Sequence, residues 1–372
     1  MATPKIAIVA DWLTNMGGAE NAVLAMHEAF PDAPIYTSTF TPETMPAFKD
    51  LDVRTTYLQK LPKPFRKLHK FFPILRVNAF KKLDLSEFDI IISSSSAESK
   101  QVQKTRPNQV HICYCHTPIR YYWSHYDEYR RDPGFGKLNW LVRLAMPLMI
   151  PALKKADLKA AQKVDVFIAN STEVQKRIKK YYGKTSTVIY PPVDVNRFTP
   201  SLTRGDYYVA LGRQVPYKRI DLAVAAATKL GIKLRVYGNG SEHQHLVDIA
   251  GPTVRFFTDR FGDASDDAVT MALNSAKGYI FPAEEDFGIV QVEALAAGAP
   301  VIAYSKGGAL DIVQDGESGV LFHQQTVGAV VDAIKRAEQI DFLPGALHRK
   351  AKRFDKSLFI TKIRKIISDN VS

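Results

Sequence analysis

The sequence predicts an α/β protein with two domains, each built around an open, mainly parallel sheet, and three observations support this. The chain has 372 residues, about twice the length of a comfortable single domain. Short apolar runs rich in Val, Ile, Tyr and Phe recur in both halves, usually followed by polar turns and helix-like segments. A proline-rich segment, residues 191–200, separates the two halves.

The expected strands are the apolar runs bounded by turns. In the first half they are Ile6–Ala10, Ile35–Phe40, Asp89–Ser93, Val110–Cys115, Val164–Ala169 and Thr187–Tyr190. In the second half they are Tyr207–Leu211, Leu234–Tyr237, Val254–Thr258, Gly278–Phe281, Val301–Tyr304 and Val320–Phe322. Continuous apolar runs are typical of strands buried on both faces, and their alternation with helices predicts crossover connections and parallel pairing.

The domain boundary is expected in the segment PPVDVNRFTP, which combines three prolines with polar residues and no helical pattern. We therefore expect an N-terminal domain over residues 1–192 and a C-terminal domain over residues 193–354. The remaining residues, 355–372, contain an amphipathic stretch that should form a helix packing back on the N-terminal domain. Open α/β sheets bind ligands beyond the carboxyl ends of their strands.

The net charge of +12 favours anionic partners: nucleic acid, phosphorylated metabolites or an anionic membrane face. Simple solubility is the alternative explanation. The two cysteines, Cys113 and Cys115, should share one strand face with their side chains ~6–7 Å apart, too far for an unstrained disulfide. We expect them to be buried and reduced, and the chain to be cytoplasmic.

No targeting or membrane-spanning segment is expected. The opening apolar run, Ile6–Ala10, is short and stops at Asp11. The most apolar later stretch, residues 138–153, is interrupted by Arg143, Pro147 and Pro151. It falls short of the roughly 20 apolar residues that a spanning helix needs.

The most informative stretch is YIFPAEEDFGIVQVEALAAGAP, residues 279–300. A strand should end at Pro282, a loop should hold Glu285, and a helix should run from Gly288 to Gly298. The amino end of that helix offers free N–H groups to an anion such as a diphosphate. Carboxylates beside it suit sugar hydroxyls, although capping of the helix is the commoner role for any one of them.

This stretch resembles the signature of the retaining family-4 glycosyltransferases, whose GT-B fold has two Rossmann-like domains facing across a cleft. The paired glutamates, the Phe-Gly between them and the following EALAAGAPVIA carry the resemblance, which extends over nearly the whole chain. It implies that Glu285 contacts the donor-sugar hydroxyls and Glu293 the ribose. It also implies that the main chain at Phe287, Gly288 and Ile289 lies along the sugar and phosphates.

The segment VALGRQVPYKRID, residues 209–221, places Arg213 and Lys218 in a loop between a strand and a helix. Fixed cations there would stabilise the charge that develops on a diphosphate leaving group. The spacing resembles the family's diphosphate-binding arginine and lysine, so both residues are assigned to that role. Arg219 is expected at the surface, and a solvated basic loop is the alternative for the pair.

In the N-terminal half, Gly17 and Gly18 follow a strand and precede a helix, where bare backbone can approach a phosphate. The resemblance places this glycine loop against the donor's β-phosphate, whereas a lone Gly-Gly is otherwise more often a turn. His116 ends a buried strand; a structural role is common for a lone histidine. The resemblance makes His116 a residue that positions the substrate, with Arg120 and Tyr121 as candidates on the acceptor side.

The nucleobase pocket is expected after the strand that ends at Thr258, where Arg260 and Phe261 would stack on or hydrogen-bond a base. Gly238–Gly240 and Gly307–Gly308 follow two other strands. The second pair is a possible glycine loop near the donor, and a plain turn is the preferred interpretation for it. No motif requires a metal or another cofactor, because the basic residues can take a metal's place.

Residues 57–83 contain eight Lys or Arg side chains, four Phe and no acidic residue. Basic residues with interleaved aromatics are typical of segments that bind anionic lipid or nucleic acid. The alternative is an ordinary solvated basic loop. Because the donor motifs indicate sugar transfer, we prefer docking to an anionic membrane surface and expect no nucleic-acid partner.

The sequence thus predicts a glycosyltransferase, peripheral to the inner face of a membrane, that moves a hexose from a nucleotide diphosphate sugar to a lipid-linked or glycan acceptor. The resemblance implies retention of the anomeric configuration, and likeness to bacterial surface-polysaccharide mannosyltransferases favours GDP-mannose as donor. The alternatives are a non-catalytic basic protein that binds anionic lipid or nucleic acid, and a sugar-nucleotide epimerase of the same fold.

Overall fold

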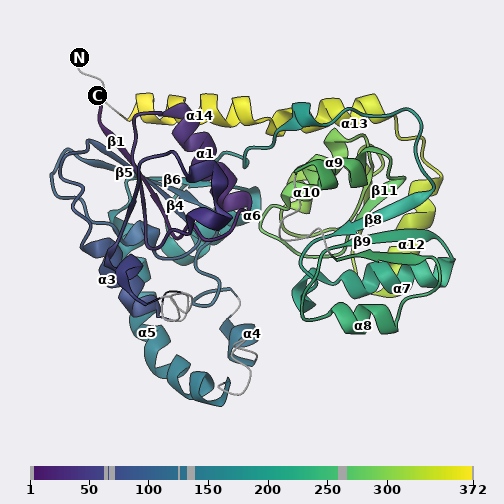
Figure 1. The fold of residues 1–372 in the computed structure, drawn as a ribbon, viewed down its shortest axis with the longest axis horizontal. Helices are drawn as coiled ribbons and strands as arrows, with labels where there is room; N and C mark the ends of the chain where they lie inside the picture. The colour runs from purple at the N-terminus through teal and green to yellow at the C-terminus, as the bar shows by residue number, and fades with distance from the viewer. Residues whose placement is uncertain are drawn as a thin grey trace. The chain divides into compact units, whose positions relative to one another are not determined.

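The structure is a computed structural model and describes residues 4–62, 66, 72–124, 126–131, 139–258 and 266–370. The chain divides into two compact units (Figure 1): Met1–Tyr190 with Phe359–Ser372, and Pro191–Leu358. Each unit is an α/β structure around one sheet of parallel strands, so the predicted fold class is confirmed. The sequence-based boundaries, at residues 192/193 and 354/355, lie within a few residues of this division.

The first unit holds a seven-stranded sheet in the order β3-β2-β1-β4-β5-β6-β7, with every neighbouring pair parallel. The strands are β1 (Ile6–Ala10), β2 (Ile35–Thr37), β3 (Val53–Thr55), β4 (Ile90–Ser95), β5 (Val110–Cys115), β6 (Val166–Ala169) and β7 (Thr187–Val188). The analysis of the sequence missed β3, because this edge strand exposes Arg54 and lacks a continuous apolar run. β2 ends three residues earlier than predicted.

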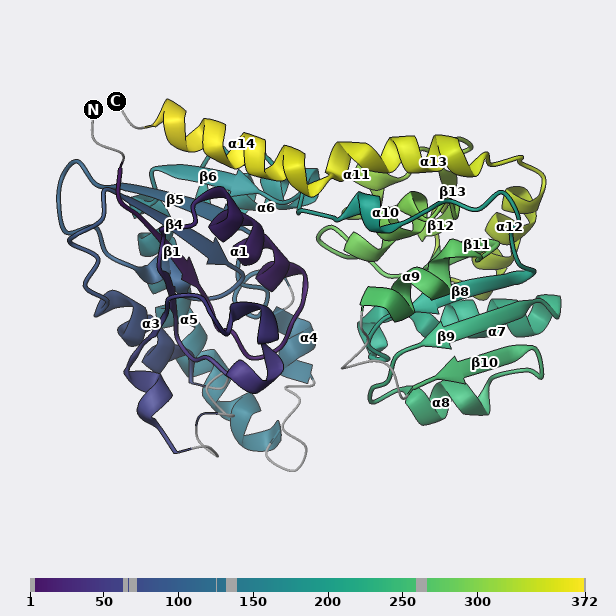
Figure 2. The same ribbon diagram turned by 45° about the horizontal axis from the view of Figure 1, so that its top comes forward.

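Helices cover both faces of this sheet. The helices of this unit are α1 (Gly18–Ala29), α3 (Pro73–Lys81), α4 (Tyr126–Arg131), α5 (Asn139–Lys163), α6 (Thr172–Tyr182) and the C-terminal α14 (Lys356–Asp369); α4 packs against α5 away from the sheet (Figure 1). α14 returns from the far end of the sequence to lie beside α1 (Figure 2), and its Phe359 and Ile363 share a core with Ile8 and Met26. On other parts of the sheet, α5 and α6 enclose Cys113 and Cys115, which are free and buried as predicted.

The second unit holds a six-stranded sheet in the order β10-β9-β8-β11-β12-β13, again entirely parallel. The strands are β8 (Tyr207–Leu211), β9 (Lys233–Tyr237), β10 (Val254–Phe257), β11 (Gly278–Phe281), β12 (Val301–Tyr304) and β13 (Gly319–Phe322). The helices are α7 (Ile220–Leu230), α8 (His243–Asp248), α9 (Asp266–Asn274), α10 (Ile289–Ala296), α11 (Ala309–Ile312), α12 (Val327–Glu338) and α13 (Pro344–Ala351).

The core of the second unit lies where α7 and α12 cover the central strands with Ala, Val, Leu and Ile side chains. The buried, nearly all-apolar strands β8, β11 and β12 form the middle of the sheet. In the described part of the chain, no helix is long and apolar enough to cross a membrane.

Candidate functional site

In the second unit, the predicted donor residues follow three neighbouring strands. β8, β11 and β12 are adjacent and parallel, so their carboxyl ends open on one edge of the sheet. Arg213 and Lys218 follow β8, the segment from Glu285 to Ile289 follows β11, and Gly307 and Gly308 follow β12. Topology alone therefore brings these three loops together.

Lys218 and Glu285 form an ion pair at this edge, between the Lys218 Nζ and the Glu285 Oε1. Their side chains are 18% and 16% exposed, so the pair is reachable from solvent without being fully hydrated. The Lys218 side chain lies over Gly212, where an added Cβ would sit 3.9 Å from the Lys218 Nζ. Gly212 has a φ of +152°, a conformation that residues with a side chain rarely adopt.

Arg213 is exposed in the same loop, and its guanidinium donates a hydrogen bond of 2.8 Å to the Tyr217 hydroxyl. The next residue, Gln214, is fully buried and was not anticipated. Its amide nitrogen donates to the Gly238 carbonyl at 2.6 Å, and its amide oxygen pairs with His243 Nδ1 at 2.7 Å. Gln214 thus anchors the loop that carries Arg213 and Lys218 to the loop after β9.

At the amino end of α10, a neighbouring group can come close to the main chain. Its N-cap residue is Gly288, with a φ of +93°; a Cβ there would lie 2.3 Å from the Gln291 Nε2. The Phe287 side chain is buried, packed edge-on against Phe354 at 5.6 Å between ring centres. Gly288 is partly exposed and has no side chain, so its main chain is accessible to solvent.

The glycine pair after β12 supports this segment directly. The Gly308 N–H donates to the Glu285 carbonyl at 2.9 Å. A Cβ at Gly307 would lie 2.2 Å from the Glu285 carbonyl oxygen, and one at Gly308 would lie 2.2 Å from the Phe287 Cα. Gly307 and Gly308 lie in a turn, as the preferred interpretation had it. The turn also makes a close backbone-to-backbone contact with the segment that carries Glu285, which leaves no space for a side chain at either position.

Glu293, one turn into α10, pairs with the Arg197 guanidinium at 2.9 Å. Arg197 lies in the proline-rich segment, which the sequence marks only as a linker, so its partner could not be read from local pattern. Two other predicted residues, Arg260 and Phe261, lie outside the described residues.

In the first unit, a second group of polar residues lies at the carboxyl edge of the sheet. His116 directly follows β5, and its Nε2 is 2.8 Å from the Ser94 hydroxyl at the end of β4. The imidazole packs edge-on against Tyr114, 5.1 Å between ring centres. This contact with Ser94 fixes the direction of the ring.

Asp11, at the end of β1, anchors the loop after β4. Its carboxylate accepts hydrogen bonds from the backbone N–H groups of Ser96, Ala97 and Ser99, all between 2.7 and 2.8 Å. Burial raises the pKa of Asp11, against the lowering effect of those backbone hydrogen bonds. In the sequence, Asp11 was noted only as the residue that ends an apolar run, so this anchoring role was not predicted.

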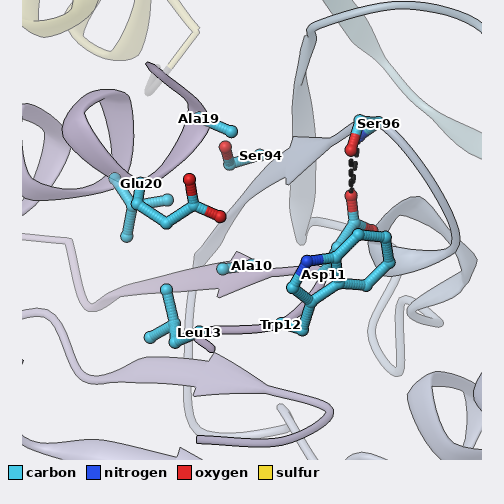
Figure 3. A pocket seen from close by; sticks show the side chains of 9 residues that line it. Ala10, Asp11, Trp12, Leu13, Ala19, Glu20, Ser94 and Ser96 are labelled. Atoms are coloured by element: carbon cyan, nitrogen blue, oxygen red, sulfur yellow. Dashed lines mark hydrogen bonds between the residues drawn. The ribbon is translucent and has the colours of Figure 1, made fainter. Parts of the chain in front are cut away.

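Figure 3 shows Asp11 with Trp12, Glu20 and Ser96 around a small cavity at this edge, about 40 Å³ in volume. Gly17 is the N-cap residue of α1 and Gly18 its first residue. A Cβ at Gly17 would lie 3.0 Å from a Glu20 carboxylate oxygen, so this carboxylate lies over the glycine loop.

Glu98 forms the centre of a buried network behind this edge. It pairs with Arg76 at 2.6 Å and accepts hydrogen bonds from the hydroxyls of Tyr121, at 2.6 Å, and Tyr122, at 3.1 Å. The Tyr121 hydroxyl, a candidate for acceptor contact, is thus part of a structural network. Arg120, the other candidate, is partly exposed.

Comparison with known proteins gives two adjoining matches. The family model described as Glycosyltransferase Family 4 matches residues 16–197, and that described as Glycosyl transferases group 1 matches residues 196–354. The chain is 29% identical over 263 residues to the D-inositol 3-phosphate glycosyltransferase of Mycolicibacterium smegmatis, covering 58% of this chain and 59% of that protein.

An uncharacterized glycosyltransferase of Methanocaldococcus jannaschii is 25% identical over 195 residues, which cover 52% of this chain and 55% of that one. The chain therefore matches little more than half the length of these curated relatives.

Two solved structures cover the chain almost completely. The Anabaena protein HepE, solved with UDP and glucose, has a TM-score of 0.70 at 17% identity, over 98% of this chain and 100% of its own. Sucrose-phosphate synthase from Thermosynechococcus elongatus also has a TM-score of 0.70 at 17% identity, over 99% of each chain. These likenesses confirm the GT-B fold that the sequence predicted.

Proposed function

Since the chain belongs to the family-4 glycosyltransferases of the GT-B fold, we propose that it transfers a hexose from a nucleotide diphosphate sugar to an acceptor hydroxyl with retention of configuration. GDP-mannose is the preferred donor. UDP-glucose, with which the Anabaena protein has been solved, is the alternative. The acceptor is a lipid-linked sugar or a glycan.

The single observation that carries the proposal is the Lys218–Glu285 pair at the carboxyl edge of the second sheet. A cation and an anion held together there match the two needs of a nucleotide sugar. The diphosphate needs positive charge, and the sugar hydroxyls need hydrogen-bond acceptors. On donor binding, Lys218 turns to the phosphates with Arg213, and Glu285 accepts hydrogen bonds from the sugar.

The chemistry follows from this charge arrangement. The bond between the anomeric carbon and the phosphate oxygen breaks, and the acceptor oxygen bonds to that carbon from the same face. The departing phosphate oxygen takes the acceptor's proton, so no carboxylate needs to attack the sugar. Arg213 and Lys218 stabilise the charge on the leaving diphosphate. These two cations take the part that a divalent metal would otherwise play, so we expect no metal requirement.

The other donor residues have supporting roles in this proposal. Glu293 binds the ribose, and the main chain at Gly288 and Ile289 lies along the phosphates. Arg260 contacts the base. In the first unit, Gly17 and Gly18 approach the β-phosphate, which requires the Glu20 carboxylate to move aside, and His116 positions the sugar through the ring direction that Ser94 fixes.

For the acceptor, we propose that residues 57–83 meet an anionic membrane at the inner face, with the enzyme peripheral to it. Much of this segment, residues 63–65 and 67–71, lies outside the described residues. In the described part, Tyr57 and Phe72 are exposed, whereas Phe80 is buried and Arg76 is held by Glu98. Within the described part of the segment, Arg76 and Phe80 are therefore not available to lipid.

The test is a thermal-unfolding screen with GDP, UDP, GDP-mannose and UDP-glucose. A ligand at about 100 times its Kd stabilises the native state by about 2.7 kcal/mol, a readily measured rise in Tm. We expect a selective rise with one base, lost in Lys218→Ala and kept in Lys229→Ala. Lys229 is an exposed lysine in the last turn of α7 and serves as the matched control.

Equal responses in the two lysine variants would contradict the assigned role of Lys218. No response to any nucleotide sugar would favour the non-catalytic alternative. Donor conversion without an acceptor would indicate an epimerase, whereas product formation only with an acceptor supports transfer. Adding a chelator to the product-formation assay tests whether transfer requires a metal, and we expect turnover to be unchanged.

A further inference from the structure

The amino-terminal half of α5 exposes a row of large apolar side chains that sugar transfer does not explain. Trp140 is 61% exposed, Leu144 is 64% exposed and Leu148 is 83% exposed. Leu141, half exposed, widens the row. Side chains this apolar are costly to leave in water, and a contiguous patch of them indicates a binding surface.

The row lies on one side of the helix. Steps of four residues advance by about 40° around an α-helix, so residues 140, 144 and 148 fall on one face. Ile150 and Leu153 of the same helix are buried and pack with Val77 of α3; α3 lies alongside α5 in Figures 1 and 2. α5 therefore has one face in the core of its own unit and a second apolar face turned outward.

Positive charge surrounds this outward face. From Asn139 to Ala156, α5 carries Arg143, Lys154 and Lys155 and no acidic residue. Arg130 and Arg131 of α4 line the same hollow as Trp140, Arg143 and Leu144, with Asp127 as the one acidic side chain among the residues known to line it. We call the apolar row together with Arg130, Arg131 and Arg143 the α5 surface.

We propose that the α5 surface binds the surface of an anionic lipid bilayer, with the helix lying in the plane of the interface. Apolar side chains flanked by arginines suit the boundary between acyl chains and anionic headgroups. A second copy of this chain would bring a second set of the same positive charges, which oppose pairing through this face. With 25 residues α5 is long enough to cross a bilayer, but it is not apolar enough to do so.

This surface differs from residues 57–83 and deepens the membrane part of the proposed function by naming the helix that inserts. It is tested without donor or acceptor, so its failure is distinguishable from failure of the proposed transfer. The full chain is sedimented with phosphatidylcholine vesicles, with and without phosphatidylglycerol. We expect binding to the anionic vesicles only, weakened by added salt.

The test variant is Leu144→Glu combined with Leu148→Glu. Two carboxylates in the apolar row should lower the partition coefficient by about tenfold or more, through lost insertion and repulsion from anionic lipid. The matched control is Leu202→Glu in the second unit, where the leucine is 88% exposed; it should bind like the wild type. All three side chains are solvent-facing, so unchanged thermal unfolding checks that each variant folds.

Tryptophan emission gives a second readout. Vesicles should shift the emission of the wild type to shorter wavelength, and Trp140→Phe should remove that shift while Trp12 and Trp123 remain. Equal vesicle binding by the double variant and the wild type would overturn the proposal. The proposal would also be overturned if the wild type were a dimer and the double variant a monomer, because the α5 surface would then be a contact between two copies of the chain.

Discussion

Gly308 offers the sharpest test of how the proposed donor segment, Glu285 to Ile289, is held. Its φ and ψ, −67° and −14°, lie in the ordinary helical region, so alanine fits the local backbone. The obstacle is the space beyond: a Cβ would lie 2.2 Å from the Phe287 Cα and 2.3 Å from the Phe287 carbonyl oxygen. Both atoms belong to backbone, so they cannot turn away as the end of a side chain would.

The expected cost of Gly308→Ala follows from this overlap. To relieve it, the loop after β12 must move away from the loop after β11 by roughly 1 Å. Overpacking of this kind costs about 1–3 kcal/mol. At about 2–4 °C per kcal/mol for a domain of this size, the second unit should unfold roughly 2–12 °C lower. The displaced segment carries Glu285, so donor affinity should fall about tenfold, equivalent to about 1.4 kcal/mol.

The assay is thermal unfolding of the wild type and of the variant, with and without the nucleotide sugar that gives the largest shift. Gly328→Ala is the control, since a Cβ there meets nothing within 4 Å and the residue lies inside α12. Because Gly328 is the second residue of α12, that change should stabilise the protein by less than the roughly 0.5–1 kcal/mol expected in the middle of a helix. If Gly308→Ala behaved like this control, the backbone contact would not position the donor segment.

Three further outcomes are expected. Burial raises the pKa of Glu98, but the charge and hydrogen bond of Arg76, the Tyr121 hydroxyl and the charge of Lys100 together outweigh it and hold the pKa below its ordinary value. The stability from this carboxylate should therefore be lost as pH falls through that lowered pKa. Glu98→Gln should cost about 3–5 kcal/mol at neutral pH, which denaturant titrations across pH would show. Burial lowers the pKa of His111 from 6.5 to about 4. As pH falls, the unfolded state therefore binds this proton before the folded state does, and the free energy of unfolding should drop by about 3 kcal/mol between pH 7 and pH 4. His111→Gln should lack this drop. Glu293→Gln should weaken donor binding about tenfold in a nucleotide titration and leave Arg197 without its anion; unchanged affinity would contradict a ribose contact.

Local patterns were sufficient for the architecture. Strands such as Ile6–Ala10 and Val301–Tyr304 are apolar throughout because both faces of a parallel sheet are covered, and this shows in any short window of sequence. Arg213, Lys218 and Glu285 were predicted to be donor-side residues because each sits in a loop between a strand and a helix, inside a family motif. Their meeting at one edge followed from parallel pairing alone.

Long-range pairing was not predictable in the same way. The segment Glu98–Gln101 reads as a polar loop, yet all four residues are buried, because Arg76 of α3 and Asp157 of α5 supply opposite charges from distant positions. The row of Trp140, Leu144 and Leu148 is similar: the apolar pattern is visible in sequence, but only the packing of the opposite face of α5 shows that this row is left outside.

By itself, then, the sequence determined two parallel α/β units and the loops that carry the proposed donor residues, since these depend on periodicity and chain order. The tertiary structure alone decided how those loops are held: Gly308 against Phe287, Arg197 on Glu293, Gln214 between two strand ends. Each of these contacts joins residues many positions apart. Whether a charge is buried or a glycine is required depends on the atoms that the fold brings against it, and no local window of sequence contains them.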